Sequence, residues 1–125
     1  MTDGITSYRD LQVWRRAIDL AEAVYQATAQ WPKDERFGLI SQIRRAAVSV
    51  ASNIAEGSAR RTTGEFLQFI GMSRGSLAET ETQIIIAQRL RYLSKPAATN
   101  LLASAEEISR MLVALAGALR KRKPA

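Results

Sequence analysis

Two residue types that many catalytic and metal sites depend on, His and Cys, are missing from this chain of 125 residues. It contains no His and no Cys, which excludes a Ser-His-Asp triad, a thiol nucleophile, a zinc–thiolate site and a Glu-x-x-His di-iron motif. Glu56 could in principle act as a general base, but no His, second acid or metal ligand accompanies it in the pattern. We expect Glu56 to accept hydrogen bonds from Arg45 or from loop amides, and we predict no enzymatic activity, no cofactor and no metal.

Arginine is the residue type with the clearest potential for binding. Of 18 basic residues 14 are Arg, against 12 acidic residues in the whole chain, and Arg forms bidentate contacts with phosphates and carboxylates. Arg-rich codon usage would give the same composition, so composition alone leaves both explanations open. Four cations lie in the tail at 120–123, and the rest of the chain holds 14 basic and 12 acidic residues. The candidate nucleic-acid contacts are Arg44, Arg45, Arg60, Arg61, Arg120, Lys121, Arg122 and Lys123.

No motif for reading base sequence accompanies these cations. The chain has no zinc finger, no recognition-helix signature and no interleaved aromatic motif of the kind that RNA-binding sheets carry. Contacts from loop and tail cations would therefore be made to the phosphate backbone, with little sequence selectivity.

Four amphipathic stretches must position these residues. Apolar residues recur at three- and four-residue steps and predict helices over 11–30, 33–56, 63–93 and 96–120. Gly57 has the position of a C-cap, and Thr62 with Glu65 has the spacing of a capping box. No strand pattern competes, and the connections are short. We predict one all-α domain over 1–125, an antiparallel up-down four-helix bundle with a short basic C-terminal tail.

Two of the expected helices carry more apolar surface than one core needs. The apolar arc of the 33–56 stretch spans about 200°, against about 100° for a surface helix, and the 63–93 stretch has three apolar rows. A central place within one subunit would explain this, but we favour burial against copies of the same chain in a ring-like homo-oligomer. Gly71 and Gly75, in mid-helix, would allow close approach of another backbone. The candidate interface residues are Phe37, Ile40, Val48, Ala51, Leu67, Arg74, Ala78, Glu81 and Ile85.

Targeting signals are not evident in the sequence. The first ten residues lack the apolar core of a signal peptide, and no apolar run approaches the roughly 18–20 residues of a membrane span. We therefore expect no membrane contact and a cytoplasmic location.

Several blocks of the sequence form a recognisable pattern: 8–14, 37–39, 42–46, 52–57, 75–79, 81–83 and 92–93, with the signature residues Asn53, Glu56, Gly57, Gly75 and Ser76 among them. Together these blocks resemble a known family, that of the four-helix-bundle proteins encoded in intervening sequences of bacterial 23S ribosomal RNA genes. The sequence departs from the family pattern at three positions, with Ala51 in place of a frequent Pro, Thr80 in place of a Leu and Arg91 in place of a Gly. The family is similar to the accessory protein of diversity-generating retroelements.

The resemblance implies an antiparallel four-helix bundle assembled as a homopentameric ring, without enzymatic activity. Nucleic-acid binding is what the retroelement relatives imply. Two functions follow as hypotheses. The first is a non-enzymatic homo-oligomer that binds RNA or DNA through a basic surface. The second is a protein-interaction scaffold that recruits a partner enzyme and has no direct contact with nucleic acid.

Overall fold

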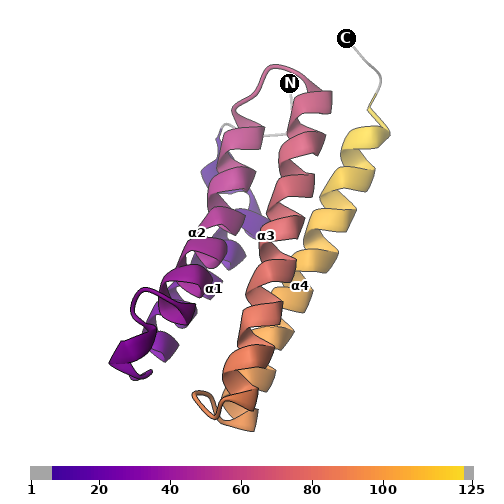
Figure 1. The fold of residues 1–125 in the computed structure, drawn as a ribbon. Coiled ribbons are helices and arrows are strands. Elements are labelled where there is room, and N and C mark those ends of the chain that lie inside the picture. Colours follow the sequence, from indigo (N-terminus) through magenta and orange to yellow (C-terminus); the bar gives the residue numbers. More distant parts are fainter. Residues whose placement is uncertain (1–6, 123–125) are drawn as a thin grey trace.

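Four long helices and two short 3-10 helices make up the computed structural model, which describes residues 7–122 (Figure 1). The elements are η1 (Tyr8–Asp10), α1 (Gln12–Thr28), η2 (Lys33–Glu35), α2 (Leu39–Ser58), α3 (Thr63–Arg89) and α4 (Lys95–Arg120). No strand occurs between residues 7 and 122. The prediction of an all-α fold with four helices is confirmed. Within the described part of the chain, no helix is both long enough and apolar enough to span a membrane.

The second helix differs from its expected bounds at both ends. It begins at Leu39 and not at residue 33, because 33–35 forms a separate 3-10 turn and Gly38 has a non-helical backbone (φ −108°, ψ −113°). Gly57 is not a C-cap. The helix α2 continues through Gly57 to Ser58. Ala59 is the C-cap, and its N–H donates a hydrogen bond to the carbonyl of Ala55.

The third helix begins and ends with recognisable caps. The Thr62 hydroxyl accepts a hydrogen bond from the Glu65 N–H at 3.1 Å and donates one to the Glu65 carboxylate at 3.1 Å, so Thr62 is the N-cap of α3. At the other end, the N–H of Tyr92 donates to the carbonyl of Ala87 at 2.9 Å, which requires the left-handed backbone seen at Arg91 (φ 67°). A glycine would adopt this backbone conformation without strain, and Arg91 is the position at which the sequence departs from a glycine of the family pattern.

A single apolar core runs between the four helices. Side chains such as Leu20, Ile43, Ile54, Leu77 and Ile108 are almost fully buried in it. Two buried hydroxyl groups are hydrogen-bonded to backbone carbonyls: the Ser73 hydroxyl on α3 donates to the carbonyl of Val50 on α2 at 2.8 Å, and the Thr80 hydroxyl donates to the carbonyl of Ser76 at 2.9 Å. At one point α2 and α3 approach so closely that only glycine fits, because a Cβ on Gly57 would lie 2.6 Å from the Cβ of Phe69.

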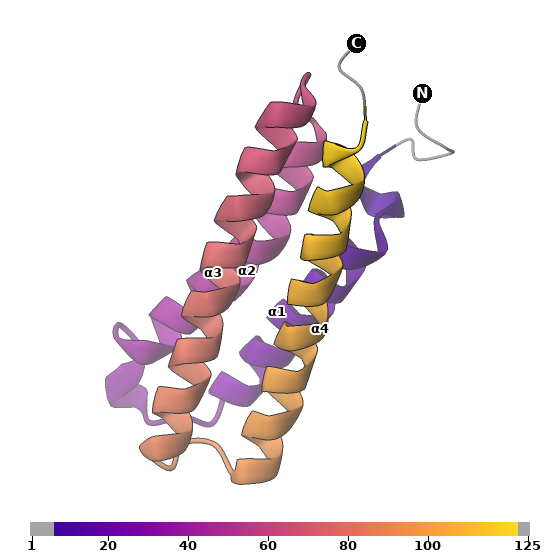
Figure 2. The same cartoon turned by 90° about the vertical axis from the view of Figure 1, so that its right-hand side faces the viewer.

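The two ends of the fold carry different chemistry. The α2–α3 connection lies at the same end as the close of α4 and as η1, and the α3–α4 connection lies at the other end (Figures 1 and 2). At the end with the α3–α4 connection, the Glu35 carboxylate accepts hydrogen bonds from the Leu39 N–H at 3.1 Å and from the Tyr92 hydroxyl at 2.9 Å. The bond from the Leu39 amide, followed by that from Tyr92, lowers the pKa of Glu35, and the same carboxylate raises the pKa of Tyr92.

Candidate nucleic-acid interface

Two segments of the chain bring cations to one end of the fold. The short loop after α2 carries Arg60 and Arg61 and turns directly into α3, and α4 is long enough to bring Arg120 back to the same end. Lys121 and Arg122 follow at the close of α4, where cations also favour the negative end of the helix dipole. We call these five residues the basic end. Lys123, the last of the predicted contacts, lies outside the described residues.

Four of the five cations of the basic end are available for an external anion. Arg61, Arg120, Lys121 and Arg122 are exposed, and none of their side chains has an ion-pair partner among residues 7–122. Arg60 differs, because it donates to the Glu56 carboxylate at 2.9 Å and its guanidinium lies 4.7 Å from the centre of the Phe69 ring. The structure thus gives Glu56 the partner Arg60, and not the expected Arg45.

Arg44 and Arg45 are not part of the basic end. They lie on α2 about 16 and 15 residues before Arg60, which is more than about 20 Å along a helix. The Arg44 guanidinium donates to the Thr28 hydroxyl at 2.8 Å and lies 4.5 Å from the centre of the Tyr25 ring, so it joins α2 to α1. Arg45 is exposed beside Phe37.

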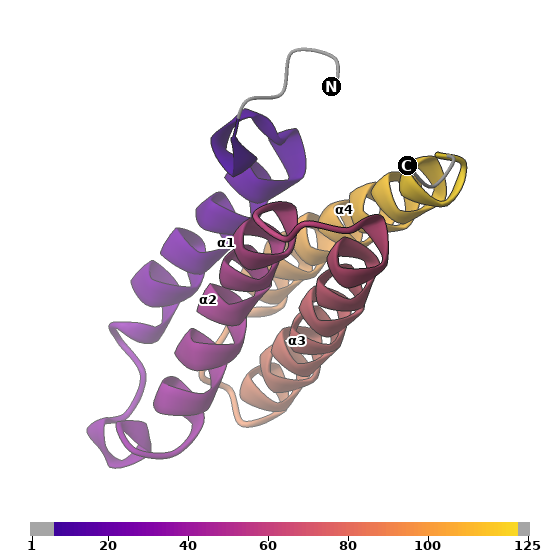
Figure 3. The same ribbon diagram turned by 90° about the horizontal axis from the view of Figure 1, so that it is seen from above.

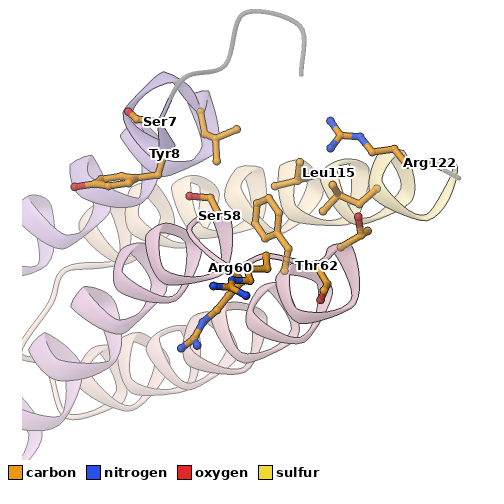
Figure 4. A pocket seen from close by; sticks show the side chains of 12 residues that line it. Ser7, Tyr8, Ser58, Arg60, Thr62, Leu115 and Arg122 are labelled. Carbon is orange, nitrogen blue, oxygen red and sulfur yellow. The ribbon is translucent and has the colours of Figure 1, made fainter. Parts of the chain in front are cut away.

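The basic end contains a pocket of about 280 Å³, shown in Figure 4. Its apolar wall comes from core residues that reach the end of the fold, Leu11, Phe66, Leu115 and Leu119, with Tyr8 beside them. Its rim carries guanidinium and hydroxyl groups, from Arg60, Arg61, Arg122, Ser7, Ser58, Thr62 and Thr63. A second hollow, of about 600 Å³, shares this rim and adds Arg120 and Gly64. An apolar wall with cations at its edge suits a ligand that combines a flat or apolar body with a negative group.

Sequence reasoning found the cations but not the pocket. Tyr8 belongs to one of the family blocks and Phe66 to the main apolar row of the 63–93 stretch, and the sequence gives Ser58 and Thr63 no binding role. Each of the four is an ordinary helix or turn residue in the sequence, and only the closing of three chain segments around one point brings them together.

The predicted interface residues fall into three groups. Ile40 (8% exposed) and Ala51 (5% exposed) are buried in the core of the chain itself. Leu67 and Glu81 are half-buried. The exposed members are Phe37, Val48, Arg74, Ala78 and Ile85.

Exposed apolar surface remains on α3 once the core is filled. Met72, Ile85, Ile86 and Leu90 are each between 42% and 50% exposed. A Cβ added at Gly71 or Gly75, on the same helix, would meet no atom within 4 Å. The predicted surplus is therefore present on this helix.

Glu81 lies next to this surface without a cation partner. No ion pair joins it to Arg74 or to any other of residues 7–122. Partial burial, followed by the nearby charge of Glu106, raises the pKa of Glu81.

Three of the five family signature residues, all on α2, take part in packing or in an ion pair within this chain. Asn53 is buried, Gly57 allows the close contact of α2 with α3, and Glu56 holds Arg60. Gly75 is exposed and Ser76 is half-buried on α3. Residues 7–122 contain no group of three or more acidic side chains that could hold a metal ion.

Comparison with known families matches residues 9–114 to the 23S rRNA-intervening sequence proteins. The chain belongs to this family. Comparison with curated protein sequences gives no match. Among solved structures, the intervening sequence protein is similar to a crystal structure of a protein with unknown function from the S23 ribosomal protein family of Bacteroides thetaiotaomicron. The TM-score is 0.75 at 19% identity, over 83% of this chain and 97% of that one. This likeness supports the fold alone. The similarity to the retroelement accessory protein stays a prediction.

Proposed function

We propose that this intervening sequence protein is a non-enzymatic, cytoplasmic homo-oligomer that binds RNA or DNA through its basic end. Each subunit is an antiparallel up-down four-helix bundle, and the family resemblance favours a pentameric ring. The supporting observation is that four exposed cations without ion-pair partners among residues 7–122 share one end of the subunit. Each would repeat with the symmetry of the ring and so add to a common positive field.

Phosphates are the ligand that this arrangement fits best. Two carboxylates beside the α2–α3 loop are already engaged, Glu56 by Arg60 and Glu65 by the Thr62 hydroxyl. The free guanidinium groups of Arg61, Arg120 and Arg122 can therefore form bidentate contacts with phosphate oxygens. Such contacts bind the backbone of any sequence and release counterions, so affinity falls steeply with salt.

Assembly is supported by the exposed apolar row on α3. A helix surface with Met72, Ile85 and Ile86 exposed beside two uncrowded glycines can be covered by another helix at close range. Covering this surface of α3 would also bury the half-buried Glu81 carboxylate more deeply. That burial costs free energy unless the carboxylate pairs with a cation, such as Arg74 of a neighbouring copy.

A salt titration in a filter-binding assay tests the nucleic-acid function. For a single strand, the logarithm of the association constant falls by about 0.7 per phosphate contact for each logarithmic unit of salt. Replacing residues 120–122 together by Gln (R120Q/K121Q/R122Q) should therefore reduce the slope by about 2. The matched control K33Q/R89Q/K95Q removes the same charge from exposed sites nearer the opposite end and should leave the slope almost unchanged. Binding that is independent of salt, or no binding at low salt, contradicts the proposal.

The scaffold function has one observation in its favour, an exposed aromatic side chain among arginines. Phe37 is 89% exposed, the Arg36 guanidinium lies 5.8 Å from its ring centre, and Arg45 and Val48 line the same hollow of about 510 Å³. Aromatic and Arg side chains are enriched where one protein binds another. A partner enzyme that is retained after nuclease treatment, and lost from a Phe37→Ser variant, would favour this function.

A further inference from the structure

The pocket at the basic end has a shape that phosphate contacts alone do not need. Arginines on a flat or convex surface would track a nucleic-acid backbone equally well. Here three of them, Arg60, Arg61 and Arg122, instead surround a hollow of about 280 Å³ whose wall is apolar. In Figure 4, Tyr8 and Ser58 lie on one side of this hollow, and Leu115 and Arg122 lie on the other.

The hollow exists because the helical core opens at this end. Viewed from above, the last turns of α4 lie apart from η1 and α1 (Figure 3). Leu115 on α4 is only partly buried, and Leu11 and Phe66 reach the same hollow from η1–α1 and from α3. Apolar side chains and an aromatic ring are thus exposed to a ligand immediately beside cations.

We propose that this pocket takes one unpaired base of a nucleic acid while the surrounding arginines bind the flanking phosphates. This rests on the proposed function and adds to it a preference for single-stranded or unpaired segments. A planar, uncharged base suits the apolar wall and can stack on an aromatic ring such as Tyr8, whatever the base sequence. A phosphate on each side of that base suits Arg61 and Arg122, which lack ion-pair partners among residues 7–122.

A base-paired duplex cannot use the pocket in this way. The bases of a duplex are stacked and paired, so one base would have to be flipped out before it could enter the pocket. Unpairing and unstacking that base costs free energy, and an unpaired strand does not have this cost. The duplex therefore binds through phosphates alone. The extra cations Arg120 and Lys121 lie beyond the pocket rim, so the site extends past a single nucleotide and favours a polymer over a free mononucleotide.

Fluorescence anisotropy with a labelled oligonucleotide of about 20 nucleotides, alone and as a blunt duplex, tests the inference at matched salt. We expect tighter binding of the single strand by the wild type. Ser58→Phe, which fills the pocket from its rim without changing charge, should weaken single-strand binding about tenfold and leave duplex binding and the salt slope within error. Ser104→Phe, on the exposed face of α4, is the matched control and should behave as the wild type.

Tyr8→Leu keeps the apolar bulk and removes the stacking ring, so it should also reduce the single-strand preference. This second variant decides the question if Ser58→Phe fails to fold. Equal affinity of the wild type for single strand and duplex, or unchanged single-strand binding by both variants, overturns the pocket inference while salt-dependent binding upholds the proposed function. No binding of either form at low salt overturns both. Saturable binding of a nucleoside monophosphate, without discrimination between the two oligonucleotide forms, would make a free nucleotide the occupant and overturn the inference too.

Discussion

Replacing Gly57 by Ala tests the closest contact in the fold. A Cβ at this position would lie 2.6 Å from the Cβ of Phe69 and 3.0 Å from a ring carbon of Phe66. Carbon atoms pack best at about 3.5–4.0 Å, so the new methyl group is short of room by about 1 Å. The Cβ of Phe69 is attached directly to the α3 backbone and cannot rotate away. The two helices must therefore move apart, and contacts along both of them weaken.

The expected magnitude combines two opposing effects. Overpacking of a tight core costs about 1–3 kcal/mol, and the fixed position of Phe69 puts Gly57→Ala at the upper end of this range. Ala is the better helix former by about 1 kcal/mol in a helix interior, which offsets part of the cost. We expect the free energy of unfolding to fall by about 2 kcal/mol.

Gly117→Ala is the matched control, because the same change on α4 adds a Cβ that meets no atom within 4 Å. It should raise the free energy of unfolding by about 0.5–1 kcal/mol through helix propensity alone. Urea denaturation followed by far-ultraviolet circular dichroism measures both variants, at one protein concentration because assembly would contribute to stability. A Gly57→Ala protein as stable as the wild type would refute the close contact of α2 and α3.

Three further predictions concern the caps and the outer face of α3. Arg91→Gly should raise the free energy of unfolding by up to about 1 kcal/mol in urea titrations, since it removes a side chain from a left-handed backbone; a lower stability would contradict this. Tyr92→Phe should lower stability near neutral pH through its lost bond to Glu35. Because the folded-state pKa of Glu35 is lowered, that contribution exists above its usual value of 4.5 and is lost as the pH falls through the folded pKa, so urea midpoints of the two proteins should converge in acid. Gly71→Ala with Gly75→Ala should stabilise a lone subunit, but should reduce the mass measured by light scattering if another copy packs on this face; an unchanged oligomeric mass would place the interface elsewhere.

The helices were predictable where the local sequence alone decides the structure. The N-cap at Thr62 involves only two residues in one turn, Thr62 and Glu65, and their spacing in the sequence predicted the start of α3 correctly. The end of α2 was not predictable in this way. Gly57 favours a helix end locally, but the packing of Phe66 and Phe69 makes it a contact point inside the helix. The burial of Ile40 and Ala51 was not predictable for the same reason, because a helical projection cannot tell which part of a wide apolar arc the core of the chain itself will use.

Composition and periodicity by themselves determined that the chain is all-α with four helices and that it contains no His and no Cys. Both are properties of residue types and of near neighbours along the chain. The tertiary structure alone decided which arginines are free and where they gather. Arg44 became a tie between α1 and α2, Arg60 became the partner of Glu56, and the loop and the close of α4 met around an apolar pocket. Such outcomes depend on contacts between segments distant in the sequence, which helical spacing does not encode.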